Sequence, residues 1–299
     1  MKIGLMLPLG ADETRGWTDL RAMALAAEED GLDSVWGADH LIFRDDGQTT
    51  GIHESWTLLT AVAAITSRVE IGPLVLAVPF RNPALTAKIA AELDEISKGR
   101  LILGLGCGWH QPEFDAFGYP FDHRVSRFEE AMKIIAPMLR EGRADFSGRF
   151  HEAADAELLP PTIREGGPPI LIAGKQPRML DLVARYADQW NAAWYGRPSE
   201  ATELRERLDR LHTALETVGR RAETLTLTAG IFVAYEDAEA DAPERAIRGS
   251  TADIADALAG YAELGISHLI AHVFPRTVDS VRRLAEAAAL ARERVALAV

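Results

Sequence analysis

Short apolar runs recur eight times along this chain of 299 residues and alternate with longer stretches of a different period. The runs are rich in β-branched residues and are flanked by glycine, which is typical of buried parallel strands. In the stretches between them, apolar residues return every three or four positions, as in amphipathic helices. The predicted strands are 3–7, 34–38, 69–76, 101–105, 170–173, 189–193, 225–233 and 268–273.

This alternation predicts consecutive βα units. Parallel strands need right-handed crossover connections, and eight such units close naturally into a (β/α)₈ barrel with its helices outside. A doubly wound open sheet is the alternative. We therefore expect one domain over residues 1–299. Two apolar stripes are predicted to be buried helix faces, namely Leu85, Ile89, Leu93 and Ile96 before Gly99, and Leu204, Leu208, Leu211, Leu215 and Val218 before Gly219.

Residues 107–168 separate the fourth and fifth predicted strands by more chain than a single helix requires. We predict a loop through Pro120, a helix over 122–140, a polar hairpin around Ser147 and Gly148, and a proline-rich return. Because segments after strand ends lie on the catalytic face of a barrel, this insertion is predicted to be a lid or substrate wall. The acidic stretch 236–244 is predicted to be a solvated, mobile loop.

The charge balance excludes several partner classes. Forty-five acidic residues against 32 basic ones give a net charge of −13, which repels nucleic acid and anionic lipid. A hydrophobic content of 47% supports a large core. The single cysteine, Cys107, excludes an internal disulfide framework and fits a reducing compartment, so we expect a cytoplasmic protein. We expect neither export through a signal peptide nor insertion into a membrane, and a small molecule is the expected substrate.

Strand two runs into Ala38-Asp39-His40, at the rim where barrel enzymes keep catalytic groups. Histidine titrates near neutral pH, so His40 could move a proton during turnover. The alternative is a loop histidine held by Asp39. His268 and His272 share one face of the last strand and are predicted to pack there or to make hydrogen bonds at the rim. No metal-binding pattern such as H-E-x-x-H is present, and no metal is expected.

Two glycine-containing turns follow the fourth and fifth strands. In Gly104–Trp109, the glycines either let a flat ring approach the backbone or make a tight turn, and Cys107 is predicted to be a buried filler. In the second turn, Gly174, Lys175 and Gln176 precede Pro177 and would present free N–H groups to a phosphate. Arg178 either adds positive charge to this turn or is an exposed surface residue without a role in binding. A Schiff-base role for Lys175 is a minor alternative.

Taken in order, these motifs resemble the bacterial luciferase-like family of flavin- and deazaflavin-dependent oxidoreductases. The likeness runs through the whole chain and is most similar to the branch that uses coenzyme F420. It is carried by Ala38-Asp39-His40, residues 68–72 with Val75 and Arg81-Asn82-Pro83, residues 99–101 and 104–109, Phe117–Phe121 with Arg127–Glu130, Pro169–Gly174 and Ala187–Asn191.

The resemblance implies a barrel that holds the cofactor ring across its strand ends, with His40 as the proton-transfer residue. Asp39, Leu74 and Val75 would contact the ring, Gly106 and Cys107 would line it, and Gly174, Lys175 and Gln176 would hold the phosphate. Phe43, Trp109 and His110 are candidate walls of the substrate pocket, and Glu54, which opens the following helix, is a candidate substrate contact. A homodimer is expected from the same likeness and from the prevalence of two-fold assemblies.

Two departures from the family pattern narrow these expectations. Sugar-phosphate dehydrogenases of the branch carry glutamate at the position of Trp109 and tryptophan at that of Arg44, so a sugar phosphate is not the expected substrate. The resemblance also implies a strand bulge with a cis peptide bond at Leu74-Val75. Pro73 directly precedes this bulge, where the family usually has a small residue, which puts the cis bond in question. The expected reaction is hydride transfer between F420 and a small organic substrate. The alternatives are a monooxygenase that uses reduced FMN and O₂, and a non-catalytic flavin-binding subunit.

Overall fold

The computed structural model describes residues 1–10, 16–45, 47–238 and 242–297. Parallel strands form the main sheet in the order β5-β2-β1-β14-β12-β11-β10-β7-β6, with β13 beside β12, and two antiparallel hairpins lie outside it. The strands are β1 Lys2–Met6, β2 Ser34–Gly37, β3 Ile42–Asp45, β4 Gln48–Gly51, β5 Glu70–Pro73, β6 Leu76–Ala77, β7 Leu103–Gly106, β8 Arg143–Ser147, β9 Glu152–Glu157, β10 Ile170–Ala173, β11 Gln189–Tyr195, β12 Thr226–Ala234, β13 Ile247–Arg248 and β14 His268–Phe274.

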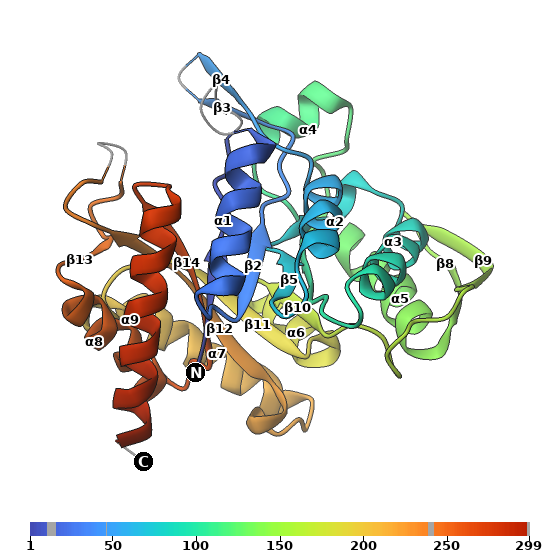
Figure 1. Ribbon diagram of the computed structural model, residues 1–299. Helices are drawn as coiled ribbons and strands as arrows, with labels where there is room; N and C mark the ends of the chain where they lie inside the picture. The colour runs from blue at the N-terminus through green and yellow to red at the C-terminus, as the bar shows by residue number, and fades with distance from the viewer. Residues whose placement is uncertain (11–15, 46, 239–241, 298–299) are drawn as a thin grey trace.

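Helices cover the outside of this sheet (Figure 1). The α-helices are α1 Trp17–Glu29, α2 Ser55–Ile65, α3 Pro83–Ile96, α4 Gln111–Phe117, α5 Arg124–Glu141, α6 Pro177–Tyr186, α7 Thr202–Thr217, α8 Thr251–Gly260 and α9 Val278–Leu297. Short 3₁₀ helices are Val78–Phe80, Pro198–Glu200, Ala222–Thr224 and Ala262–Leu264.

The sheet closes on itself through residues 70–77. β5 and β6 are two parts of that stretch, separated by the bulge at Leu74 and Val75. β5 pairs with β2 at one end of the strand order, and β6 pairs with β7 at the other. An isolated parallel bridge between Ile71 and Leu101 completes the closure. The predicted (β/α)₈ barrel is confirmed and the open sheet is wrong, and the Leu74-Val75 bond is cis despite Pro73.

Side-chain parity separates the inside of the barrel from the layer under the helices. Six buried residues from different parts of the barrel wall form one apolar cluster, Met6, Trp36, Leu74, Ile102, Leu171 and Ile270. Residues adjacent to them in sequence belong to the larger cluster shared with the helices. Because strand side chains alternate between faces, His268 and His272 lie on the same, inward face as Ile270.

The predicted apolar stripe of the helix before Gly99 is wrong at its ends. Leu85 is 52% exposed and Ile96 is 39% exposed. α3 instead buries small residues and an aspartate, namely Thr86, Ala87, Ala90, Ala91 and Asp94 together with Leu93. Alanines let the helix approach its neighbours closely, and Arg164 donates to the Asp94 carboxylate at 2.9 Å, which neutralises its buried charge. The second stripe is buried as predicted, except that Val218 is 39% exposed.

The inserted segment 107–168 consists of α4, α5 and the hairpin β8–β9, and these elements lie at different places around the barrel. α5 is a helix of the barrel layer, packed between α3 and α6. The hairpin β8–β9 lies against α5 and away from β2 (Figure 1). Residues around α4 approach the end of β2, where Glu113 contacts His40, and the lid role of the insertion stays a prediction. Residues 239–241 of the predicted acidic loop lie outside the described residues, and Asp237 pairs with Arg283 at 2.8 Å.

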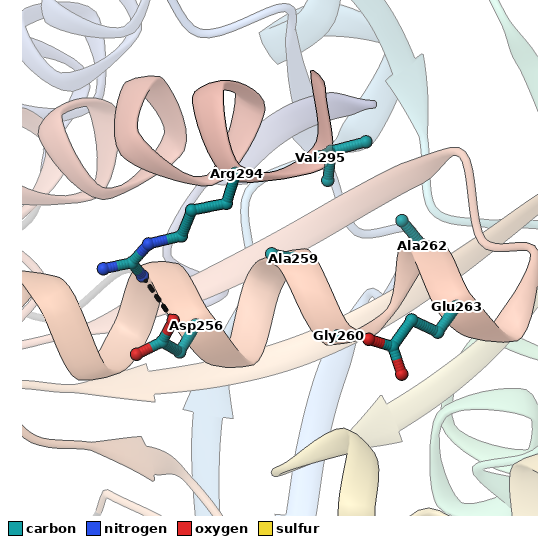
Figure 2. Close-up of a pocket in the computed structure, with 7 residues that line it drawn as sticks. All are labelled: Asp256, Ala259, Gly260, Ala262, Glu263, Arg294 and Val295. Atoms are coloured by element: carbon teal, nitrogen blue, oxygen red, sulfur yellow. Dashed lines mark ion pairs between the residues drawn. The ribbon is translucent and has the colours of Figure 1, made fainter. Parts of the chain in front are cut away.

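A cavity of about 480 Å³ lies between α8 and α9 (Figure 2). Its lining includes Gly260 and Val295, from the ends of two helices that run back along the barrel. These ends lie at the amino-terminal side of the strands, where barrel enzymes keep stabilising contacts rather than catalytic ones. The cavity is therefore not the candidate site. Within the described ranges, every helix is too short or too polar to cross a bilayer.

Candidate active site

Four aromatic rings gather where β2 and β7 end. The His40 ring lies 4.4 Å from that of Phe43 and 5.6 Å from that of Trp109, measured between centroids. The His110 ring lies 5.2 Å from both Phe43 and Trp109. Phe43 belongs to the β3–β4 hairpin, which the sequence did not predict. The structure thus brings together His40 and three of the predicted pocket residues, and Trp109 is 64% exposed beside them.

A buried carboxylate holds the His40 imidazole. His40 Nδ1 lies 2.9 Å from Glu113 Oε1, and the Glu113 side chain is 1% exposed. The second oxygen of Glu113 accepts the backbone N–H of Leu41 at 2.8 Å. A carboxylate can only accept hydrogen bonds, so Nδ1 is the donor and Nε2 is left for the site. The His40 side chain is 15% exposed, so the imidazole combines a fixed orientation with partial access to solvent.

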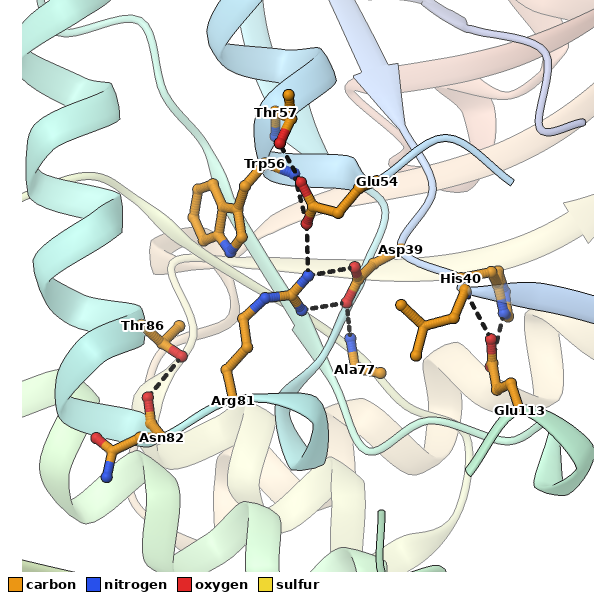
Figure 3. Close-up of polar contacts among 11 residues, drawn as sticks. Asp39, His40, Glu54, Trp56, Thr57, Ala77, Arg81, Asn82, Thr86 and Glu113 are labelled. Carbon is orange, nitrogen blue, oxygen red and sulfur yellow. Dashed lines mark hydrogen bonds and ion pairs between the residues drawn. The ribbon is translucent and has the colours of Figure 1, made fainter. Parts of the chain in front are cut away.

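Asp39 serves a different partner from the one predicted (Figure 3). Both its oxygens accept from Arg81, at 2.7 and 2.8 Å, and one also accepts the backbone N–H of Ala77. These bonds fasten the end of β2 to the strand that contains the bulge. Although burial opposes it, the hydrogen bonds and charge of Asp39 raise the pKa of Arg81. The interpretation that Asp39 holds His40 is wrong, and contact of Asp39 with a ring stays a prediction.

Glu54 is the amino-terminal cap of α2. Its oxygens accept the backbone N–H groups of Trp56 and Thr57 at 3.2 and 2.7 Å, and Arg81 at 2.9 Å. Burial acts to raise the pKa of Glu54, but these hydrogen bonds outweigh it and the pKa is lowered. The carboxylate is thus committed to helix capping and an ion pair, which removes the main reason for expecting it to touch substrate.

Close backbone approach explains the glycines at the end of β7. A Cβ on Gly104 would lie 2.0 Å from the carbonyl oxygen of Pro73, and one on Gly106 would lie 2.7 Å from a methyl group of Val75. The absent side chains at these glycines therefore make room for the bulge, and the lining of a ring by Gly106 and Cys107 stays a prediction. Burial raises the pKa of the Cys107 thiol, as expected for a filler, although the charge of Arg124 acts against it.

The turn after β10 gathers positive charge at the start of α6. Gln176 is the amino-terminal cap residue of α6, and its side chain makes no capping hydrogen bond to the helix. Burial lowers the pKa of Lys175, and the charges of Arg207 and Arg245 act in the same direction, whereas the charge of Glu203, the partner of Arg207, opposes them. In a chain of net charge −13, cations that repel one another beside uncapped N–H groups fit an anionic group such as a phosphate.

Aromatic residues also line the opposite side of the barrel mouth. His272 lies 4.6 Å from Trp194 and 5.8 Å from Phe232 between ring centroids, the latter pair stacked. Deeper in the barrel, His268 is 2.7 Å from the Ser34 hydroxyl. Burial lowers the pKa of both histidines to about 3, so they are neutral packing groups, as predicted. The structure therefore provides an aromatic wall on each side of the strand ends.

Sequence reasoning missed the roles of three residues here, Glu113, Arg81 and Trp194. Each contacts a partner that is distant in sequence: Glu113, for example, lies 73 residues from His40. The available signal was weak: Glu113 lies in the first turn of a short helix that follows the glycine turn, and His110 is the amino-terminal cap of that helix. Among the residues that the structure describes, no group of three or more His, Cys, Asp or Glu side chains is placed to hold a metal ion.

Comparison with known proteins shows the family. A family model described as luciferase-like monooxygenase matches residues 1–297. The chain is 35% identical over 235 residues to an F420-dependent glucose-6-phosphate dehydrogenase of Amycolatopsis mediterranei, which covers 75% of this chain and 67% of that protein. It is 31% identical over 251 residues to the pyrimidine monooxygenase RutA of Methylorubrum extorquens, which covers 76% and 66%. The chain thus spans about two thirds of the length of these relatives.

A solved structure supports the fold independently. An F420-dependent secondary alcohol dehydrogenase in complex with an F420-acetone adduct superposes with a TM-score of 0.80, covering 97% of this chain and 99% of that one, at 20% identity. At this identity the likeness establishes the barrel and its connections alone. The family model that matches residues 1–297 and the two relatives show that this chain belongs to the luciferase-like monooxygenase family and is an oxidoreductase or monooxygenase.

Proposed function

We propose that this enzyme transfers a hydride between coenzyme F420 and a small organic substrate, with His40 moving the accompanying proton. The observation that carries the proposal is the His40–Glu113 pair, a partly exposed imidazole fixed by a buried carboxylate at a strand end. When bound, F420 supplies a deazaflavin carbon that accepts or gives a hydride. The protein has to position the substrate oxygen or nitrogen near Nε2 of His40.

The residues of the barrel mouth fit such a cofactor. A tricyclic ring would lie between the wall of Phe43 and Trp109 and the wall of Trp194 and Phe232. The turn at 174–176, with the charge of Lys175, would hold the phosphate. Among the relatives, the F420-dependent glucose-6-phosphate dehydrogenase supports the choice of F420. Trp109 stands where such enzymes carry glutamate, so we propose a substrate other than a sugar phosphate.

The second candidate is a monooxygenase that uses reduced FMN and O₂. Its support is the 31% identity to the pyrimidine monooxygenase RutA. The same aromatic walls and the same phosphate turn would accept FMN, and His40 would again be the proton-transfer residue. A non-catalytic flavin-binding subunit is a third possibility, and the oriented His40 argues against it. The small-molecule substrate and the homodimer stay predictions in all three cases.

A binding experiment separates these candidates. Purified protein is mixed with F420 and with FMN in parallel, and quenching of ring fluorescence gives the two dissociation constants. We expect F420 to bind at least about tenfold tighter, which corresponds to about 1.4 kcal/mol. Tighter binding of FMN would favour the monooxygenase, and failure to bind either would exclude the proposal. Tight F420 binding without exchange of reducing equivalents with any alcohol, aldehyde or ketone would support the non-catalytic subunit.

A further inference from the structure

A second cavity, of about 340 Å³, lies beside the proposed phosphate turn on the catalytic side of the barrel. Its lining comes from the segment that begins α5 and from the first turn of α6, and consists of Phe121, His123, Arg124, Val125, Ser126 and Arg178. Both helices follow barrel strands, so their starts lie at the strand ends that form the active-site face. Two arginines and a histidine line the cavity, and no carboxylate does.

Arg124 is the least neutralised cation of this cavity. It donates to the carbonyl oxygen of Gly108 at 2.7 Å and lies 4.0 Å above the Phe121 ring. Among the described residues it has no carboxylate partner. It is also the first residue of α5, whose first turn contains no acidic residue. A helix dipole disfavours a cation at this end, and an anion bound beside Arg124 would offset that cost.

The other charges near the cavity are already paired. Arg178 donates to Glu129 at 2.8 Å and to Ser126 at 3.0 Å, while its side chain stays 55% exposed. Asp122 accepts from Arg127 at 2.8 Å and also contacts His123. The two nearby carboxylates thus have their own basic partners, which leaves the charge of Arg124 and the outer donors of Arg178 for an incoming anion.

We propose that this cavity binds the carboxylates of the F420 side chain beyond its phosphate. F420 carries a lactyl and oligoglutamyl chain there, whereas FMN ends at its phosphate. Arg178 lies two residues after Gln176 of the proposed phosphate turn, so a chain that leaves this turn outward meets the cavity at once. In a chain of net charge −13, an acidic ligand needs local cations to offset long-range repulsion. This assignment rests on the proposed function.

Three fluorescent probes test the assignment by direct binding. They are the deazaflavin core without phosphate, F420 with its phosphate but no glutamates, and F420 with several glutamates. We expect the wild-type protein to bind the longest probe about tenfold tighter than the probe without glutamates, as for one or two charge-assisted contacts. Raised salt should shrink that advantage, because the cavity is open to solvent.

Matched variants connect the effect to the cavity. Arg124→Gln and Arg178→Gln should each remove about threefold or more of the advantage of the long chain, with affinity for the phosphate-free core unchanged. Arg124→Lys should keep part of it, because the charge remains. Arg185→Gln is the control, since Arg185 is exposed at the far end of α6.

The outcomes separate this assignment from the proposed function. Equal affinity of wild-type protein for F420 with and without glutamates would overturn the assignment alone. So would an Arg124→Gln variant that weakens all three probes equally, because the residue would then act on the fold or on the ring site. If none of the three probes binds to the wild-type protein, the proposed function fails and the assignment fails with it.

Discussion

The two sides of the barrel mouth each place a histidine among aromatic rings, but they differ in what surrounds the imidazole. On the β2 side, His40 is held by the carboxylate of Glu113 and stays partly exposed. On the β14 side, His272 packs against Trp194 and Phe232 with burial that lowers its pKa to about 3. A carboxylate partner fixes which ring nitrogen carries the hydrogen, whereas burial in an apolar stack favours the neutral imidazole.

This contrast teaches that position at a strand end does not by itself make a catalytic histidine. Both residues follow the barrel rule that functional groups lie at the carboxyl ends of strands. Only His40 has an ionisable partner that fixes one ring nitrogen and leaves the other for the site. We therefore propose that proton transfer takes place on the β2 side, and that the residues of the β14 side shape the barrel mouth.

Removing the imidazole on the β2 side should have the largest effect. His40→Ala is expected to lower kcat by about 10² to 10⁴, or roughly 3 to 5 kcal/mol, because the general acid–base is lost. Cofactor affinity should change little, as measured by fluorescence titration. The matched variant on the other side, His272→Phe, should keep most of kcat. If the two variants were equally impaired, the contrast between the two sides would be lost.

The buried histidines should instead control acid stability. The pKa values of His268 and His272 are lowered from 6.5 to about 3, so the unfolded chain takes up protons first as pH falls. Stability is then complete above about pH 6.5 and is lost as pH falls from there toward 3. We expect the free energy of unfolding to drop by about 4 kcal/mol from pH 7 to 5 on account of both groups.

Urea unfolding at several pH values measures this dependence. His272→Phe removes one of the two groups and keeps an aromatic ring, so it should reduce the loss between pH 7 and 5 by about 2 kcal/mol. An unchanged slope in this variant would show that His272 does not titrate from a depressed pKa.

The carboxylate behind His40 should have an intermediate effect. Glu113→Ala is expected to lower kcat by about 100-fold and Glu113→Gln by about tenfold, because the amide oxygen can still accept from Nδ1. KM should change little in both. Nitrogen NMR of the His40 ring without cofactor should show its hydrogen on Nδ1 in wild type and a mixed population in Glu113→Ala. A kcat unaffected by both substitutions would remove Glu113 from the account.

The smallest effect is expected at Glu54, which lies on the β2 side without a role in proton transfer. Glu54→Ala should cost about 1 kcal/mol of stability through the lost cap of α2. Its kcat should stay within about twofold of wild type. A loss as large as that of His40→Ala would show that the carboxylate touches the reacting groups after all.

Periodicity predicted the barrel because strands and helices must each bury one face at a fixed interval. The rim residues followed from it, since parallel strands in a barrel end on one face and so bring His40, Trp109 and Lys175 to the same side. The pairing of His40 with Glu113 could not be predicted from periodicity. The two residues lie 73 positions apart, and the course of a loop brings them together. The faces of α3 were misassigned because close packing selected alanine over leucine.

A crystal structure of the protein with F420 bound tests the central claim most directly. We predict that the deazaflavin ring lies across the strand ends, between the His40–Phe43 side and the Trp194–Phe232 side, with Nε2 of His40 facing the reactive edge of the ring. A ring bound elsewhere, or an imidazole turned away from it toward solvent, would contradict the account.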